Sequence, residues 1–357
     1  MNAAFWRGKR VFITGHTGFK GGWLALWLQR TGAEVHGYAL EPPTTPNLFK
    51  VAGVGQGLTG HTLADIRDAA SLRSAVVAAA PDIVLHLAAQ PLVRRSYVDP
   101  VETYGVNVLG AVHLFESVRA CPSVRAVVNV TSDKCYVNRE DGRAYREGDA
   151  LGGDDPYSSS KAAAELVTHA YRQSFLAKAR VGVASARAGN VIGGGDWAED
   201  RLVPDLLRAC DRGEALQVRN PNATRPWQHV LEPLSGYLAL AQRLFESTGE
   251  GGQAPSGAWN FGPSADDARP VGWLVEQLVA RLPDTAWRHD GAAGPHEAAR
   301  LKLDSRKAHE QLGWRPRWPL AQALDRTVDW HLAWRRGDDM QAMCMAQIDA
   351  YEQAAPT

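Results

Sequence analysis

Residues 11–28 read VFITGHTGFKGGWLALWL, in which a β-branched and aromatic run, a glycine-rich turn and an apolar segment follow one another directly. Val11–Thr14 favours a strand, and Trp23–Leu28 favours a buried helix. This order points backbone N–H groups and the positive end of the helix at the place where a pyrophosphate binds. The glycines of Gly15–Gly21 are spaced G-x-x-G-x-x-G, and such a triplet by itself is often only a turn. Its position between a strand and a helix predicts a dinucleotide-binding turn.

The rest of the chain continues the alternation of strands and helices that a parallel sheet requires. We expect further strands at residues 34–40, 82–89, 125–130 and 181–187, and long helices at residues 101–119 and 157–177. The sequence therefore predicts an α/β protein with a Rossmann-type doubly wound parallel sheet.

The texture of the sequence changes after Gly189, where irregular segments such as Gly193–Trp197 are rich in glycine and aromatic residues. Segments of this kind often form loops that carry a binding surface. We expect residues 1–187 to form the dinucleotide-binding domain with the catalytic residues. Residues 188–357 are expected to form a smaller mixed α/β domain that binds the substrate, with helices at residues 273–282 and 320–335.

Composition excludes several classes of partner. The chain has 357 residues, and its 39 basic residues balance 39 acidic ones without a long basic run, which argues against nucleic acid or an anionic membrane as the main partner. The 4 cysteines are scattered, with no spacing typical of a disulfide framework or a zinc site, so we expect no metal and a reducing, cytoplasmic compartment. The first apolar run breaks at Gly15, too soon for a signal peptide or a membrane span.

A second group of residues predicts a catalytic site. Tyr157 and Lys161 are four residues apart, so on a helix they share one face and the lysine can lower the pKa of the phenol. Asp155 and Pro156 mark the start of that helix. Ser132 and its two successors follow the expected strand 125–130, and ligands of an open α/β sheet bind at the edge where such strands end. A Tyr/Lys pair at this spacing is common by chance, but its place in this order favours a functional site.

The end of the second strand bears on the choice of dinucleotide. An acidic residue near Ala39 would bind the ribose hydroxyls of NAD, and the nearest carboxylate is Glu41. Because no arginine follows that could accept a 2′-phosphate, we expect NAD and not NADP.

These motifs resemble the extended short-chain dehydrogenase/reductase family, the NAD-dependent epimerases and dehydratases. Within it, Gly15–Gly21, Thr131–Tyr136 and Arg225–Val230 resemble the CDP-glucose 4,6-dehydratases. The Asp133-Lys134 pair is the specific part, since other sugar-nucleotide 4,6-dehydratases usually carry Asp-Glu there and 4-epimerases lack the acidic pair.

The resemblance implies a role for each of a larger set of residues. The catalytic residues it implies are Ser132, Asp133, Lys134, Tyr157 and Lys161. The NAD-binding residues it implies are Gly15, Thr17, Gly18, Phe19, Lys20, Gly21, Asp65, Ile66, Leu87, Ala88, Ala89 and Asn107, with Tyr157 and Lys161. The substrate-binding residues it implies are Gln90, Arg95, Asn190, Arg201, Arg219, Arg225 and His229.

The resemblance also implies a reaction. Tyr157 would take the proton of the sugar C4 hydroxyl as C4 is oxidised, and Asp133 would protonate the departing C6 hydroxyl. Lys134 leaves two roles open. Burial can lower a lysine pKa from about 10.4 by several units, which would make Lys134 the base at C5. A protonated Lys134 would instead stabilise the enolate. We favour the base.

The implied substrate is CDP-glucose, and the implied assembly is a homodimer or a dimer of dimers, formed through the helices that carry Tyr104 and Tyr157. Two other classes compete with this interpretation. Another nucleotide-sugar 4,6-dehydratase or a 4-epimerase would share the glycine turn, but the Asp133-Lys134 pair argues against both. A dinucleotide sensor without activity would not need Ser132, Tyr157 and Lys161.

Overall fold

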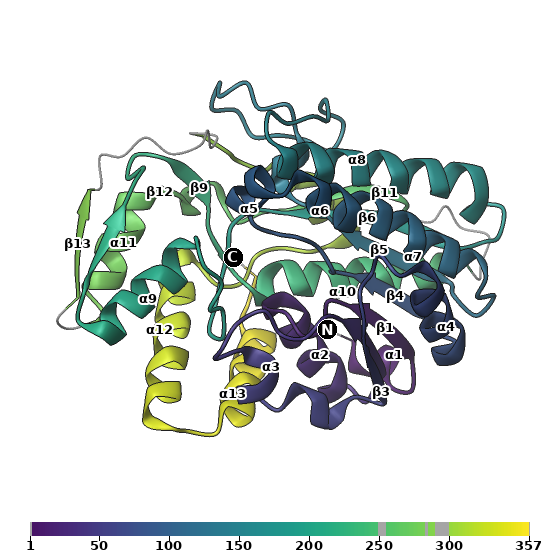
Figure 1. The fold of residues 1–357 in the computed structure, drawn as a ribbon, viewed down its shortest axis with the longest axis horizontal. Coiled ribbons are helices and arrows are strands. Elements are labelled where there is room, and N and C mark those ends of the chain that lie inside the picture. The colour runs from purple at the N-terminus through teal and green to yellow at the C-terminus, as the bar shows by residue number, and fades with distance from the viewer. Residues whose placement is uncertain (1, 249–254, 283–284, 290–299, 357) are drawn as a thin grey trace.

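Seven parallel strands form the central sheet of the computed structural model, which describes residues 2–248, 255–282, 285–289 and 300–356 (Figure 1). Their order across the sheet is β11-β6-β5-β4-β1-β2-β3. The strands are β1 (Arg10–Thr14), β2 (Glu34–Ala39), β3 (Gly60–Leu63), β4 (Ile83–His86), β5 (Ala126–Val130), β6 (Gly182–Ala188) and β11 (Gly257–Phe261). The predicted Rossmann-type sheet is confirmed.

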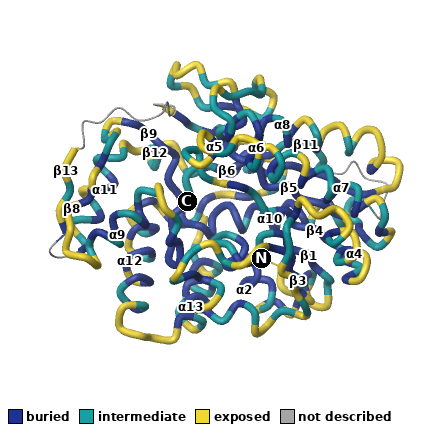
Figure 2. The backbone as a smooth tube through the Cα atoms, viewed as in Figure 1, coloured by how far each residue is buried: buried dark blue, intermediate teal, exposed yellow. Residues whose placement is uncertain are grey.

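Two layers of helices cover this sheet. Helices α2 (Phe19–Arg30) and α10 (Leu231–Ser247) pack on one face, and α13 (Met340–Gln353) packs outside α2. Helices α4 (Ala69–Ala79), α7 (Gly110–Arg119) and α8 (Pro156–Tyr171) form the core of the other face. Figure 2 shows the central strands as the most buried part of the chain. Because helices cover both faces of the sheet, strands such as β5 are buried at every position.

Each of the two long helices expected from the sequence contains a π-helical segment, in the middle of the first and at the end of the second. Residues 100–119 divide into α6 (Pro100–Tyr104), a π-helix at Gly105–Leu109 and α7. Helix α8 is followed by a π-helix at Arg172–Leu176. π-Turns often occur at functional sites, and the first of these holds Asn107.

Most of the chain after residue 188 lies at the C-terminal edge of the parallel strands. Its helices and strands are α9 (Leu202–Arg212), α11 (Val271–Val279), α12 (Leu320–Arg336), β7 (Val191–Ile192), β8 (Ala215–Val218), β9 (Thr224–Pro226), β10 (Gln228–His229), β12 (Ala268–Pro270) and β13 (Ala286–His289). The remaining helices are α1 (Ala3–Trp6), α3 (Leu48–Val51) and α5 (Val93–Val98).

The division at residue 188 stays a prediction about domains. The chain returns to the central sheet after that point, because α10 covers β5 and β6, and β11 pairs with β6. The separate core under α9, α11 and α12 is built by residues beyond 188. Among the described helices, none is long and apolar enough to cross a membrane.

Candidate active site

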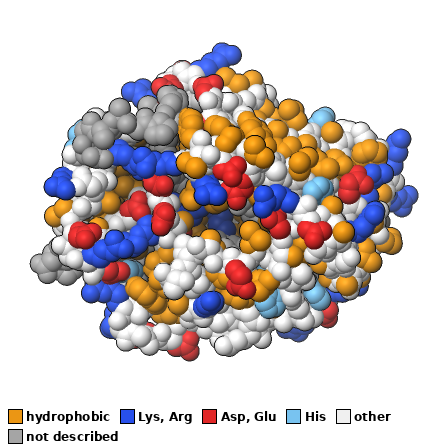
Figure 3. Space-filling view, in the orientation of Figure 1, with side chains coloured by type: hydrophobic (Ala, Val, Ile, Leu, Met, Phe, Trp, Pro, Cys, Tyr) orange, Lys and Arg blue, Asp and Glu red, His pale blue; other side chains and the backbone are white. Residues whose placement is uncertain are grey.

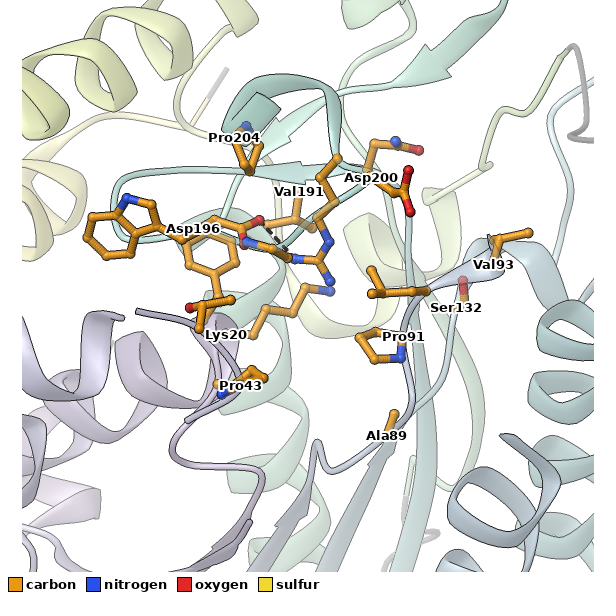
Figure 4. A pocket seen from close by; sticks show the side chains of 18 of the residues that line it. Lys20, Pro43, Ala89, Pro91, Val93, Ser132, Val191, Asp196, Asp200 and Pro204 are labelled. Carbon is orange, nitrogen blue, oxygen red and sulfur yellow. Dashed lines mark hydrogen bonds and ion pairs between the residues drawn. The ribbon is translucent and has the colours of Figure 1, made fainter. Parts of the chain in front are cut away.

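A cavity of about 590 Å³ opens at the C-terminal edge of the sheet, between the central strands and the C-terminal elements (Figure 4). The glycine turn, the ends of β4 and β5, the start of α8 and the segment 188–205, which contains β7 and the first turn of α9, all contribute to its walls. Ligands of open α/β sheets bind at this edge, and the volume lies in the range of small-molecule sites.

The glycine turn packs so closely against neighbouring backbone that it has no room for side chains at Gly15 and Gly21. Gly15 has φ +82°, and a Cβ there would lie 2.8 Å from the Ala88 nitrogen. A Cβ on Gly21 would lie 2.1 Å from the Gly15 oxygen. Helix α2 begins after Gly18 with no side chain capping its first N–H groups. These N–H groups and the positive helix end can therefore bind a pyrophosphate.

The wall next to the turn fits a ribose. The Thr17 hydroxyl donates to the Leu40 oxygen at 2.8 Å and ties the turn to the end of β2. Glu41, the carboxylate singled out in the sequence, lines the cavity two residues beyond β2, and Asp65 and Ile66 also line it. A carboxylate at this position suits the free ribose hydroxyls of NAD.

The loop after β4 is fixed from outside the cavity. Leu87, Ala88 and Ala89 line the cavity. Asn107 does not, but its Oδ1 accepts from the Gln90 nitrogen at 2.9 Å and its Nδ2 donates to the Gln90 oxygen at 3.1 Å. The π-helix thus places Asn107 where it clamps the backbone that follows the lining residues.

The five predicted catalytic residues all line the cavity, and they come from two elements. The 3₁₀ turn after β5 carries Ser132, Asp133 and Lys134, and the first turns of α8 carry Tyr157 and Lys161. The Asp155 carboxylate accepts from the Ser158 nitrogen at 2.8 Å, so the predicted cap is confirmed.

Burial sets the ionisation of this wall. It raises the pKa of the Tyr157 phenol to about 12, and a hydrogen bond with Ser132 opposes that rise. It lowers the pKa of Lys161 to about 8, against the charge of Glu165. Burial also lowers the pKa of Lys20, which extends into the cavity (Figure 4), to about 7, and the charge of Arg201 adds to this effect.

Asp133 is sealed more tightly than its neighbour. It is 1% exposed, and its Oδ1 accepts from the Ser132 hydroxyl at 3.1 Å. A Cβ on Gly189 would lie 3.0 Å from its Oδ2, so the close packing depends on a glycine there. No hydrogen bond reaches that buried Oδ2 from the described part of the chain.

Arginines line the opposite wall, and two of them are already near an acid. Arg201 pairs with Asp196 at 2.8 Å, and Arg219 lies 3.7 Å from Asp200. Asn190 and Arg225, both predicted from the sequence, also line the cavity. This wall can bind a diphosphate, since guanidinium groups pair with phosphate oxygens.

Four predicted residues lie outside the lining. Gln90 and Asn107 bind each other behind the wall, as described above. Arg95 is turned to the surface and pairs with Glu102 at 3.0 Å. His229 is fully buried, with its ring 4.9 Å from that of Trp318. The structure thus places His229 in the packed interior and Arg95 at the surface, and their substrate-binding roles stay predictions.

Sequence reasoning missed residues that face the cavity or support it. Asp196, Asp200 and Arg94 line the cavity, and the sequence assigned none of them a role. Arg94 lines the cavity and pairs with Asp200 at 3.0 Å. The acids Asp196, Glu199 and Asp200, followed directly by Arg201, are the signal that could have indicated ion pairs in this segment.

Known proteins resemble this chain in sequence and in fold. The family model described as GDP-mannose 4,6 dehydratase matches residues 12–327. The chain is 53% identical over 356 residues to CDP-glucose 4,6-dehydratase of Salmonella typhimurium, covering 98% of both chains. It is 26% identical to dTDP-glucose 4,6-dehydratase of Xanthomonas campestris over 90% of this chain and 92% of that one.

Solved structures agree. MoeE5 in complex with UDP-glucuronic acid and NAD matches with a TM-score of 0.74 and 26% identity, over 92% of this chain and 99% of that one. The dTDP-glucose 4,6-dehydratase of Bacillus anthracis, in complex with NAD, has the same fold, with a TM-score of 0.74 and 20% identity over 94% and 99% of the chains. The chain therefore belongs to the GDP-mannose 4,6-dehydratase family, within the extended short-chain dehydrogenases/reductases.

Proposed function

We propose that this protein is a CDP-glucose 4,6-dehydratase, a hydro-lyase that converts CDP-D-glucose to CDP-4-dehydro-6-deoxy-D-glucose and water. The likeness to the Salmonella enzyme over nearly the whole of both chains carries this proposal. The Asp133-Lys134 pair on the cavity wall supports it. Other sugar-nucleotide 4,6-dehydratases usually carry Asp-Glu there, so this pair favours a CDP-glucose 4,6-dehydratase over them.

The cofactor is NAD, which when bound supplies the hydride acceptor for C4 and returns the hydride to C6. The glycine turn would hold its pyrophosphate, and Glu41 and Asp65 lie where its ribose hydroxyls would be bound. Leu87, Ala88 and Ala89 line the same cavity and would contact it with apolar side chains.

Tyr157 acts as the base at the C4 hydroxyl. A phenol whose pKa is raised to about 12 by burial is protonated at neutral pH, so the phenolate must be stabilised when the site is filled. The Lys161 ammonium and the Ser132 hydroxyl share the cavity with Tyr157 and supply that stabilisation.

Elimination then needs an acid at C6 and a base at C5. Asp133 is buried and has an oxygen without a described partner, which suits a carboxylic acid that donates its proton to the leaving hydroxyl. Lys134 reaches the cavity beside it and removes the C5 proton, which the neighbouring ketone has made acidic.

The arginine wall binds the nucleotide diphosphate. Arg201, Arg219 and Arg225 lie on it, with Asn190 between the two walls. The Asn190 Oδ1 is buried and receives no hydrogen bond from a described group, so it has acceptor capacity for a sugar or ribose hydroxyl.

The direct test incubates the purified protein with CDP-glucose and NAD, and follows the 4-keto product by its absorbance in alkali. We expect turnover with CDP-glucose and little with dTDP-glucose or GDP-mannose. Turnover of either of these instead would redirect the assignment to another 4,6-dehydratase. Formation of an epimer, or binding of NAD without any turnover, would support the 4-epimerase or the sensor.

We also infer a homodimer, or a dimer of dimers. Apolar side chains are exposed on α5, α6, the following π-helix and the α8 region, and they form an orange band in Figure 3. We call this set the apolar band: Tyr97, Val98, Val101, Tyr104, Leu109, Leu166 and Phe175. Exposed bands of this kind mark protein interfaces, and a second copy packing helix against helix would cover it.

The compartment and the use of the product belong to the same proposal. The 4 cysteines are unpaired, as in proteins of a reducing compartment, and we infer a cytoplasmic enzyme. Its product is a deoxysugar nucleotide, which we place in the biosynthesis of a polysaccharide.

A further inference from the structure

Behind the catalytic wall lies a buried ion pair between Glu165 and Arg187. Glu165 stands one helical turn after Lys161 on α8 and is 5% exposed, and Arg187 on β6 is 2% exposed. Arg187 donates from Nε to one carboxylate oxygen at 2.9 Å and from Nη2 to the other at 2.8 Å. The hydroxyls of Thr131 and Ser185 each donate to one of the same oxygens at 2.5 Å. Four donors thus hold Glu165 as a carboxylate in one orientation.

Arg187 is fixed in turn from its other side. Its Nη1 donates to the Tyr136 hydroxyl at 2.8 Å and to the Glu147 oxygen at 3.2 Å. The Tyr136 hydroxyl donates to Asn260 at 2.7 Å, so the network reaches β11. A charged pair at this depth is favourable only when its remaining hydrogen bonds are made, and here they are made.

This pair ties together the two elements that carry the catalytic residues. Thr131, which binds Glu165, directly precedes Ser132 and Asp133. The Lys161 amino group, on the same helix as Glu165, donates to the Val130 oxygen at 3.5 Å. The end of β5 and helix α8 are therefore joined at two consecutive residues, directly beside the reacting groups.

The charge of Glu165 also acts on Lys161. Besides Tyr157, which lines the same cavity, the titratable groups that interact electrostatically with Lys161 are Glu165 on α8, Cys135 after β5, His86 on β4 and Lys20 on α2. Burial raises the pKa of Cys135 well above its usual value and lowers the pKa of His86 to about 3, so both are neutral near pH 7. Among these four groups the negative charge comes from Glu165, whose hydrogen bonds lower its pKa despite burial.

We propose that Glu165 is a positioning residue of the reaction. Pinned by Arg187, it aligns the strand end that carries Ser132 and Asp133 with the helix that carries Tyr157, and it supplies the charge that keeps Lys161 an ammonium. This inference rests on the proposed function, because it assigns Lys161 the task of stabilising the Tyr157 phenolate.

The test is Glu165→Gln, which keeps the length of the side chain and removes its charge. Without the carboxylate the ammonium form of Lys161 is less favoured, so the pKa of Lys161 falls. The alkaline limb of kcat/KM for CDP-glucose then moves to lower pH by about one unit, the low end of the effect of a nearby opposite charge. Ser185→Ala is the matched control, because it removes one hydrogen bond to Glu165 and leaves the charge, and its alkaline limb stays in place.

Glu165→Gln leaves Arg187 buried without its partner, which can unfold the protein. The double variant Glu165→Gln/Arg187→Met removes both charges, and thermal unfolding followed by circular dichroism shows which variants fold. A readout independent of turnover is the pH dependence of acetylation of Lys161 by acetic anhydride, measured by peptide mass spectrometry on protein without NAD.

The outcomes separate this inference from the proposed function. A lower acetylation pKa of Lys161 together with a shifted alkaline limb, in a folded variant, supports the role of Glu165. An unchanged acetylation pKa and an unchanged limb in a folded variant overturn it. A wild-type protein that does not dehydrate CDP-glucose overturns the proposed function instead, whatever the acetylation shows.

Discussion

The Lys134 amino group lies 3.7 Å from Oδ1 of Asp133, and the two side chains differ in exposure, at 24% for the lysine and 1% for the aspartate. The aspartate is enclosed between Ser132 and Gly189, while the lysine reaches into the cavity. Neighbours in sequence thus meet different environments, which is how one turn can provide both an acid and a base.

This geometry predicts separate effects of three substitutions at Lys134. Lys134→Met removes the base, so we expect exchange of the C5 hydrogen and product formation to fall roughly 100- to 10,000-fold, the usual contribution of a general base. Lys134→Arg keeps a positive charge but cannot release its proton, so it is expected to lose exchange as well. Lys134→Glu restores a base and is expected to retain exchange.

The measurement follows deuterium incorporation at C5 in heavy water, beside NADH fluorescence, which reports the earlier oxidation at C4. We expect NADH to accumulate in the Met and Arg variants, since the oxidation does not need Lys134. Exchange at the wild-type rate in Lys134→Met would refute the base. Exchange in Lys134→Arg but not in Lys134→Met would assign Lys134 to charge stabilisation.

The second prediction concerns Asp200, which holds Arg94 at 3.0 Å and Arg219 at 3.7 Å on the rim of the cavity. A diphosphate must compete with this carboxylate for the arginines and is repelled by it. Asp200→Asn should lower the KM for CDP-glucose roughly two- to fivefold, as expected from ~0.5–1 kcal/mol for a partly exposed ion pair. The value of kcat should stay the same.

Steady-state kinetics at two salt concentrations check this, because added salt screens the repulsion and narrows the difference from wild type. Asp141→Asn is the control, since Asp141 is a partly exposed acid that pairs with Arg143 and does not line the cavity. An equal fall in KM for both variants, or a higher KM for Asp200→Asn, would contradict a competing carboxylate at the rim.

The third prediction concerns the apolar band. Val101 is 81% exposed on α6 and Leu166 is 60% exposed on α8. Placing a carboxylate on either should dissociate the dimer, because the charge would be buried without a partner. Light scattering after size-exclusion chromatography measures the mass of Val101→Glu and Leu166→Glu. Val77→Glu on α4, where Val77 is 47% exposed outside the band, should keep the wild-type mass. A monomeric wild type, or an unchanged mass in both band variants, would reject the interface.

The sequence predicted those helices, strands and turns that a short run of consecutive residues specifies. The glycine turn, the capped start of α8 and the buried strands β4, β5 and β6 are each marked by consecutive residues, and the structure confirms them. Strand β3 is short and alternates in burial without an apolar run, so its four residues gave no signal. Strand β11 joins the sheet beside β6 from far along the chain, and a pairing of that kind is a tertiary property.

The site residues likewise fall into those that a local pattern marks and those that only the packing of the fold reveals. Each of the five catalytic candidates lies within a few residues of a recognisable strand end or helix start, and all five line one cavity. Arg187 lies at the end of an expected strand and Glu165 lies within an expected helix, but only the packing of α8 on β6 reveals that the two side chains meet. The substrate-binding role of His229 stays a prediction, and sequence does not show that Trp318 packs against its ring.

The last prediction concerns stability and Glu232, a fully buried acid at the start of α10. Its carboxylate accepts from the Trp318 nitrogen at 2.7 Å and from the Tyr351 hydroxyl at 2.7 Å, and so joins α10 to α13. Burial raises its pKa to about 7 despite these bonds. The folded protein therefore holds a proton on Glu232 that the unfolded chain releases near its usual pKa of about 4.3.

The sign follows from this proton. The stabilisation is fully present below the unfolded pKa and is lost as pH rises through about 7, because the folded state must then ionise a buried carboxyl. A shift of this size corresponds to ~4 kcal/mol at most. The glutamine in Glu232→Gln does not ionise. The melting temperature of this variant relative to that of wild type should therefore rise by a few degrees between pH 5 and pH 8. Glu246→Gln, at an exposed position of the same helix, should keep a constant offset from wild type. A constant offset for Glu232→Gln as well would mean that Glu232 keeps one ionisation state in the folded protein across this range.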